Sequence, residues 1–239
     1  SNKMIGIEDP EYAGQDNQAA ALELYAYAND LANKRREEPQ DDLITRLINA
    51  EIIGDDGETT VLNEQEIDGF MLLMAVAGNE TTRHTITHSM NYLIDNPDQM
   101  ALLQERPELI EWGVEEMLRM ASPVYHFRRT ATKDTEINGQ AIKEGDKVVT
   151  WFAAGNRDPE IFVDPYRMDV TRNPNEHMTF GRGGPHMCLG NSLARLEIKI
   201  MFEELLPRIS DIKRVGELER LRSNFVNGIK RFPVEVTLK

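Results

Sequence analysis

The sequence has a single cysteine, Cys188, which follows a turn rich in glycine. The stretch from Phe180 to Gly190 reads Phe-Gly-Arg-Gly-Gly-Pro-His-Met-Cys-Leu-Gly and leads into an apolar periodic segment. The start of a helix offers unpaired N–H groups and the positive end of the helix dipole, which stabilise a thiolate. Glycines let the backbone approach a flat ligand closely. This pattern suits iron chemistry at the sulfur.

Other interpretations of this turn are weaker. A lone cysteine is most often a small buried apolar residue. A phosphate-binding loop of the type G-x-G-x-x-G would need glycine where His186 stands, and no G-K-[S/T] follows. One cysteine also forms neither an internal disulfide nor a multi-cysteine zinc site, which favours a reducing cytoplasm as the location of the chain.

A second pattern places an acid beside an alcohol in the stretch Ala77-Gly78-Asn79-Glu80-Thr81-Thr82. The stretch lies within a predicted long helix. A threonine in mid-helix can bond back to the carbonyl four residues earlier, here that of Ala77, and so bend the helix. From the residues alone this structural account is favoured over a chemical role for Glu80 and Thr81.

Two further patterns are ambiguous from the residues alone. Glu116 and Arg119 form an i,i+3 acid–base pair, which is usually a solvated helix face. Glu80, His84 and His88 recur every four residues, so they share one helix face and could bind zinc. The H-E-x-x-H base is absent, and two helical histidines are more often packing or surface residues.

The elements that must position these residues begin with helices. Apolar periodicity predicts helices over 17–33 and 41–51, with an acidic turn at 54–57 after the second. Asn63 with Glu66 three residues later looks like a capping box, and no strong breaker follows before Asn96-Pro97. One long helix is therefore predicted over 64–95, followed by another over 107–120.

The pattern then changes from helix to sheet. Short antiparallel strands are expected between Arg129 and Phe152, and an ordered irregular loop over 155–175. A closing hairpin around Asn227-Gly228 precedes a strand over 234–238. The expected core stripe of the helix after the cysteine is made of Leu189, Leu193, Leu196, Ile200 and Leu205.

The cysteine turn resembles the heme-ligand signature of the cytochrome P-450 family: a Phe, glycines, a His or Arg two residues before the Cys, and a Gly two residues after it. Here Phe180 lies one residue further from Cys188 than in the commonest version. That spacing is similar to bacterial members that oxidise sterol side chains and branched lipids. The resemblance implies that Cys188 binds the iron of heme b, with Phe180 and Gly190 beside it.

The resemblance also implies roles for the other patterns. Ala77 and Gly78 would open a groove for dioxygen, and Glu80 with Thr81 would match the family's acid–alcohol pair that delivers protons for O–O cleavage. Arg129, or its neighbour Arg128, and His186 would bind the heme propionates. The structural triad would consist of the residues Glu116, Arg119 and Arg167 from the motif Phe-Val-Asp-Pro-Tyr-Arg.

The resemblance runs from about Ile5 to the C-terminus, so residues 1–239 are expected to be the C-terminal portion of one P-450 domain, mainly α with a small β portion and lacking the family's N-terminal part. It implies hydroxylation of a hydrophobic substrate such as a sterol or branched lipid, with O2 as co-substrate and electrons from NAD(P)H through a ferredoxin or similar donor. The alternative is a fragment that keeps the motifs without holding heme.

Composition narrows the range of partners. The chain has 41 Asp and Glu against 27 Lys and Arg, a formal net charge of −14. Such a charge opposes binding to nucleic-acid phosphates. No apolar run reaches membrane-spanning length, so we expect no membrane span.

Overall fold

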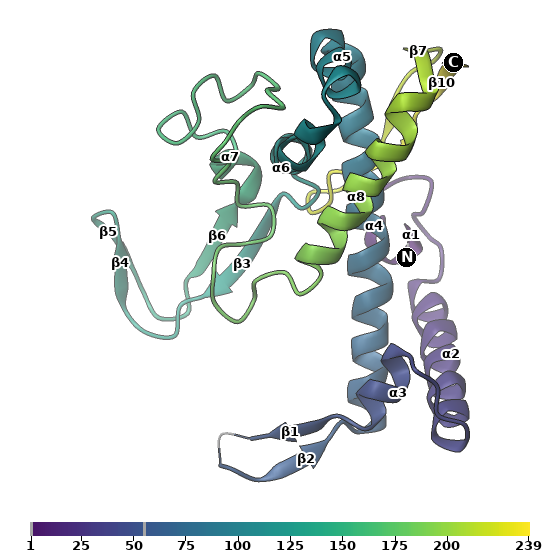
Figure 1. Ribbon diagram of the computed structural model, residues 1–239. Coiled ribbons are helices and arrows are strands. Elements are labelled where there is room, and N and C mark those ends of the chain that lie inside the picture. The colour runs from purple at the N-terminus through teal and green to yellow at the C-terminus, as the bar shows by residue number, and fades with distance from the viewer. Residues whose placement is uncertain (1, 55) are drawn as a thin grey trace. The chain divides into compact units, whose positions relative to one another are not determined.

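The computed structural model describes residues 2–54 and 56–239, and the chain divides into two compact units, Ser1–Glu80 and Thr81–Lys239 (Figure 1). The elements of the first unit are α1 (Asn2–Ile5), α2 (Asn17–Glu37), α3 (Leu43–Ile48), β1 (Glu51–Ile53), β2 (Thr59–Val61) and the first half of α4 (Glu64–Asp95). Its core is a small apolar cluster of Ala32, Ile44 and Ile67.

Helix α4 confirms the predicted long helix with the same bounds, Glu64–Asp95. The capping box that begins it is complete. The N–H of Asn63 donates to Oε2 of Glu66 (2.8 Å), and the N–H of Glu66 donates to Oδ1 of Asn63 (3.0 Å). Two of the N–H groups at the helix start are thereby satisfied by side chains, which explains why the helix begins there.

The hairpin before α4 was not predicted. Strands β1 and β2 pair antiparallel, with Ile52 opposite Thr60. They flank the predicted acidic turn at 54–57, in which the N–H of Gly57 donates to the carbonyl oxygen of Gly54 (2.9 Å); Asp55 of that turn lies outside the described residues. Both strands are exposed and only three residues long, so neither carries the alternation that reveals a strand.

The second unit continues from α4 through helices and short strands. Its further elements are α5 (Pro97–Glu105), η1 (Pro107–Leu109), α6 (Ile110–Ala121), β3 (His126–Thr130), β4 (Thr135–Ile137), β5 (Gln140–Ile142), β6 (Lys147–Trp151), α7 (Phe152–Gly155), α8 (Asn191–Leu205), η2 (Leu206–Arg208), β7 (Ile209–Arg214), β8 (Glu219–Arg220), β9 (Ile229–Arg231) and β10 (Val234–Leu238).

The strands of this unit form two-stranded antiparallel pairs in the part of the chain described: β3 with β6, β4 with β5, β7 with β10 and β8 with β9. The predicted strands between residues 129 and 152 and over 234–238 are confirmed. So is the irregular loop over 155–175. The mainly α class with a small β portion is therefore confirmed.

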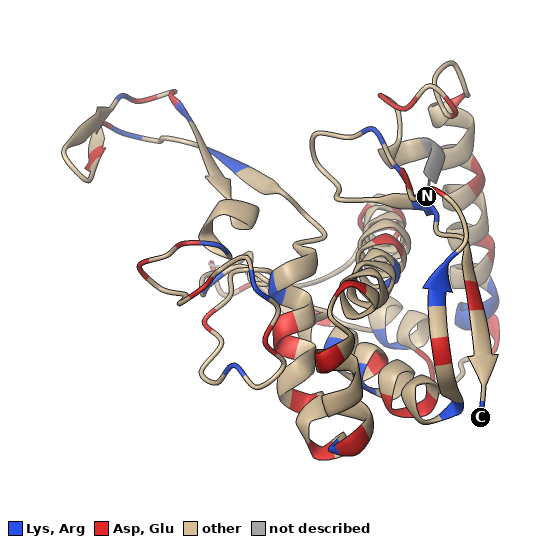
Figure 2. Cartoon of the chain, turned by 90° about the horizontal axis from the view of Figure 1, so that it is seen from above, with Lys and Arg blue, Asp and Glu red and all other residues tan. Residues whose placement is uncertain are grey.

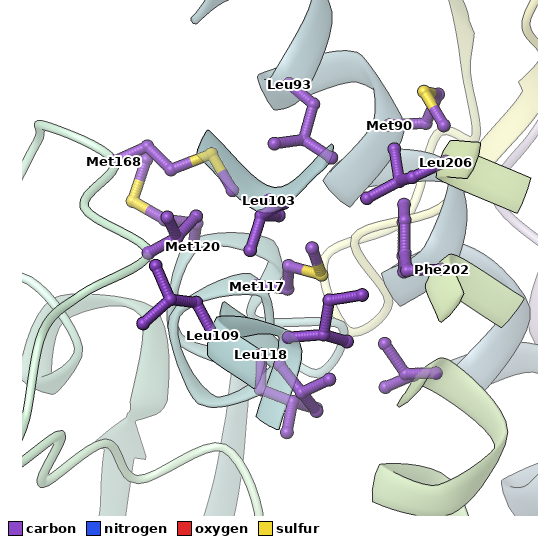
Figure 3. Packing of buried hydrophobic residues seen from close by; sticks show 14 of the residues in the cluster. Met90, Leu93, Leu103, Leu109, Met117, Leu118, Met120, Met168, Phe202 and Leu206 are labelled. Atoms are coloured by element: carbon purple, nitrogen blue, oxygen red, sulfur yellow. The ribbon is translucent and has the colours of Figure 1, made fainter. Parts of the chain in front are cut away.

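The core of the second unit lies between α4, α5, α6 and α8. Figure 3 shows Met117 and Leu118 of α6 near Leu103 of α5 and Phe202 of α8. A Cβ added at Gly113 would stand 3.2 Å from the Leu103 side chain, so α6 approaches α5 closely there. This packing holds the start of α8 and the acidic residues of α6 in fixed positions relative to one another.

The predicted core stripe of α8 was wrong. Leu193, Leu196 and Ile200 are 49–55% exposed, and Leu189 ahead of the helix is 80% exposed, whereas Leu205 is partly buried. The fully buried positions are Ile198 and Phe202. Residues 196 and 198 point about 200° apart on a helix, so α8 is apolar on two faces, and periodicity alone does not say which one meets the core.

Charge is distributed over the whole chain. Figure 2 shows acidic and basic positions interspersed along the helices and loops. None of the described helices is long and apolar enough to span a membrane.

Candidate functional site: the cysteine turn and the networks behind it

Cys188 is held through its main chain on both sides. Its N–H donates to the carbonyl oxygen of Phe180 (2.9 Å), and its carbonyl oxygen accepts a hydrogen bond from Nδ2 of Asn191 (2.7 Å). Its side chain is exposed and forms no disulfide, so the interpretation of a buried cysteine was wrong. The chain between Phe180 and Cys188 turns with positive φ at Gly181 (76°), Gly183 (70°) and Gly184 (76°).

The two residues assigned to the propionates are also exposed. Among the described residues, none forms a hydrogen bond or ion pair with the side chain of His186, and Nη1 of Arg129 donates to the neighbouring carbonyl of Arg128 (3.0 Å). A thiol is a ligand for the iron of a porphyrin, and a guanidinium and an imidazole each bind one of its two carboxylates. All three groups are present here and exposed. The residues present therefore fit heme.

Glu116 and Arg119 form a buried pair at the centre of a larger network. Nε and Nη2 of Arg119 donate to the two carboxylate oxygens of Glu116 (both 2.7 Å), and both side chains are 0% exposed. Nη1 of Arg119 also donates to the carbonyl oxygens of Asn156 (2.8 Å) and Pro165 (2.7 Å). The pair is thus not a solvated helix face, and it ties α6 to the irregular loop.

The second arginine of this network, and its third member, is Arg172, and the prediction of Arg167 was wrong. Arg167 is exposed, and its carbonyl oxygen accepts from Nη2 of Arg119 (3.2 Å). The guanidinium beside Glu116 belongs to Arg172, whose Nε lies 3.2 Å from Oε2, an ion pair without an aligned hydrogen bond. Met168 and Val170 are buried, and Arg172 is the next residue in this series of every second position. This period of two could have indicated from the sequence that the side chain of Arg172 points inward.

Sequence reasoning missed a second network, centred on Glu115. The side chain of Glu115 accepts hydrogen bonds from Nε2 of His177 (2.9 Å) and from Nε (2.6 Å) and Nη2 (2.9 Å) of Arg195. Burial alone would raise the pKa of Glu115, but the hydrogen bonds from His177 and Arg195 and the charge of Arg195 outweigh it and lower the pKa to about 2. No local pattern links these three residues, which come from three separate segments.

The acid–alcohol pair lies in the middle of α4. Glu80 is 2% exposed, and Nδ2 of Asn79 donates to its Oε1 (3.4 Å). Ala77 and Gly78 are exposed, and Thr81 is partly buried. The helix is continuous through this stretch. Glu80 closes the first compact unit and Thr81 opens the second.

The two histidines of the rival zinc pattern are engaged with main-chain groups. Nδ1 of His84 accepts from the N–H of Ile229 (3.2 Å), and Nε2 of His88 donates to the carbonyl oxygen of Asn227 (2.9 Å). Burial lowers the pKa of His88 to about 4, against the hydrogen bond to Asn227, which acts to raise it. These contacts make both rings packing residues that hold Asn227 and the first residue of β9, Ile229, against α4.

Comparisons with known proteins identify the family. The model of the cytochrome P450 family matches residues 9–210. The steroid C26-monooxygenase of Mycobacterium tuberculosis is 43% identical over 238 residues, which are 99% of this chain and 53% of that protein. The linalool 8-monooxygenase of Pseudomonas putida is 42% identical over 241 residues, 100% of this chain and 58% of that protein.

A solved structure shows the same relation. A cytochrome P450 of Mycobacterium marinum, in complex with pseudoionone, is 41% identical with a TM-score of 0.89 and covers 98% of this chain, which covers 56% of that one. The chain spans about half the length of the curated relatives it matches. Because the family model matches most of its residues, the chain belongs to the cytochrome P450 family, of whose fold it contains a part.

Proposed function

We propose that this chain is the heme-binding portion of a monooxygenase that inserts one oxygen atom of O2 into a hydrophobic substrate. The observation that carries the proposal is the exposed thiol of Cys188, whose main chain is held by one hydrogen bond to Phe180 and one from the side chain of Asn191 at the end of a glycine turn. Relatives named steroid C26-monooxygenase, linalool 8-monooxygenase and methyl-branched lipid omega-hydroxylase support a hydrophobic substrate.

The residues of the second unit have distinct roles in this proposal. Cys188 supplies the sulfur ligand, and Phe180 and Gly190 shape the backbone around it. Arg129 and His186 bind the two propionates by charge-assisted hydrogen bonds. When bound, heme b supplies the dioxygen chemistry, and the thiolate increases the electron density at iron that favours O–O cleavage.

The residues of α4 would serve the proton and oxygen steps. Ala77 and Gly78 have no bulky side chains and leave room for dioxygen along the helix. Glu80 and Thr81 hold a proton and pass it toward the oxygen site, because breaking the O–O bond needs protons delivered where bulk water is scarce. The electrons come from NAD(P)H through a ferredoxin or a similar donor.

The carbon monoxide spectrum of the reduced protein tests the proposal. The 239-residue chain is titrated with heme, reduced and exposed to carbon monoxide, beside a Cys188→Ala variant. Thiolate-bound heme gives a strongly red-shifted Soret band, so we expect this band in the parent and its loss in the variant. The same band in Cys188→Ala would overturn the assignment of the ligand.

A second candidate follows from the length of the chain, which covers about half of each curated relative. It is a fragment that keeps the motifs but does not hold heme. Absence of stoichiometric heme after titration, with the chain folded, would favour this candidate. If heme is bound, difference spectra with a panel of sterols, methyl-branched fatty acids and linear fatty acids would distinguish the substrate classes.

A further inference from the structure

We propose that Arg195 is a positioning residue for Cys188, holding the main chain of the cysteine from both sides through Phe180 and Asn191. The inference deepens the proposed function, since it rests on Cys188 as the iron ligand. Arg195 lies on the second turn of α8, seven residues after the cysteine. None of its contacts involves the sulfur atom, so its effect is exerted through the backbone.

The first route runs through the ring of Phe180. The guanidinium carbon of Arg195 lies 4.6 Å from the centre of that ring, within the range of a cation–π contact. The ring of His177 lies 5.9 Å from it, centre to centre. Because the carbonyl oxygen of Phe180 accepts the N–H of Cys188, fixing the ring restricts the peptide that receives this hydrogen bond.

The second route runs through the side-chain amide of Asn191. Nη1 of Arg195 donates to Oδ1 of Asn191 (3.0 Å), and Nδ2 of the same amide donates to the carbonyl oxygen of Cys188 (2.7 Å). Arginine has donors and no acceptor, so it selects the orientation in which the amide oxygen faces it. The amide nitrogen is thereby directed at Cys188.

Glu115 and His177 fix Arg195 in turn. The carboxylate of Glu115 takes two hydrogen bonds from the fork of Arg195, a bidentate contact that sets the plane of the guanidinium. Nδ1 of His177 accepts from the N–H of Thr179 (3.2 Å), which leaves Nε2 to donate to Glu115. One guanidinium therefore faces a carboxylate, an amide and a ring, and a lysine ammonium does not have this planar arrangement of donors.

The test is amide hydrogen exchange at Cys188 in the full 239-residue chain without heme, measured by NMR for the parent, Arg195→Lys and Asn191→Ala. Arg208→Ala is the matched control, because Arg208 forms an exposed ion pair with Glu204 at the other end of α8. We expect exchange at Cys188 to rise roughly fivefold to tenfold in Arg195→Lys, less in Asn191→Ala, and not in Arg208→Ala. The amide of Leu118, buried in α6, reports whether each variant remains folded.

Two outcomes would overturn the inference. The first is equal exchange at Cys188 in Arg195→Lys and Arg208→Ala. The second is a rise in exchange at Leu118 in Arg195→Lys as large as that at Cys188, which would mean that Arg195 stabilises the fold in general. The chain loaded with heme adds a second readout: Arg195→Lys should lower the share of the red-shifted carbonyl band. Because the exchange measurement needs no heme, failure of Cys188 as the iron ligand would appear only in the Cys188→Ala spectrum.

Discussion

Helix α6 presents two neighbouring carboxylates, Glu115 and Glu116, to two different networks. The Glu116 network is removed from water, with both Glu116 and Arg119 0% exposed. In the Glu115 network the side chain of Glu115 is 26% exposed and that of Arg195 36%. The two networks thus differ in burial although their acids are adjacent in sequence.

The partners of the two networks differ as well. The buried network bonds to main-chain groups of the loop, namely the N–H of Asp169, which donates to Glu116 (2.9 Å), and the carbonyls of Asn156 and Pro165, and to the side chain of Asn175. The partly exposed network ends on the side chains of Phe180 and Asn191, and both residues bond to the main chain of Cys188. The buried pair thus ties α6 to the loop at several points, whereas the partly exposed network is the one that we propose to position Cys188.

The largest expected effect comes from removing the charge of Glu116. In Glu116→Gln the charge of Arg119 stays buried without its counter-charge, so we expect the free energy of unfolding to fall by about 3–5 kcal/mol. Urea denaturation, with Glu115→Gln as the matched variant one residue away, measures the difference. A loss for Glu116→Gln no larger than that for Glu115→Gln would remove the distinction between the networks.

His88 also contributes to the pH dependence of stability, so its effect must be known before acid unfolding is used to compare the two networks. Its pKa is about 4 in the folded chain and 6.5 ordinarily, so the unfolded state binds its proton first as pH falls. We expect about 3 kcal/mol of stability to be present above pH 6.5 and to be lost progressively down to about pH 4. His88→Gln should flatten the pH dependence of urea midpoints in this window, and an unchanged slope would contradict the assignment.

A smaller effect is expected from Glu115→Gln, about 1 kcal/mol at neutral pH, because water screens its partly exposed ion pairs. The folded pKa of about 2 lies below the ordinary 4.5, so this contribution is present above pH 4.5 and is lost as pH falls toward 2. The difference in stability between parent and variant should therefore narrow across that range. Urea midpoints at pH 7 and pH 3 check this, and a gap that widens at pH 3 would refute it.

The smallest effect is expected on the exposed stripe of α8. Leu193→Gln should change the free energy of unfolding of this chain by no more than about 0.5 kcal/mol, since the residue is 55% exposed. Phe202→Ala on the buried face should cost about 3–5 kcal/mol. Thermal unfolding of both variants provides the comparison, and similar losses would mean that the stripe belongs to the core after all.

The parts of the site that could be predicted from the sequence are those encoded within a few residues. The capping box of Asn63 and Glu66 lies within one turn, and it determined the start of α4. The three glycines before Cys188 predicted a turn, and that turn is present, with positive φ at all three. Glu116 and Arg119 stand at i,i+3, so their contact on one helix face could be expected before any packing was known.

Tertiary structure decided what depends on residues far apart in the chain. Glu115 meets His177 and Arg195 across separations of 62 and 80 residues, and no local pattern selects those partners. Whether Arg172 or Arg167 pairs with Glu116 depends on which side of the loop faces α6. The sequence by itself determined the long helix α4, the turn and the lone sulfur, because short-range sterics and hydrogen bonds specify them. Only the packing of α6, α8 and the loop against one another decided which charged side chains pair near Cys188. The same packing decided which apolar face of α8 is buried.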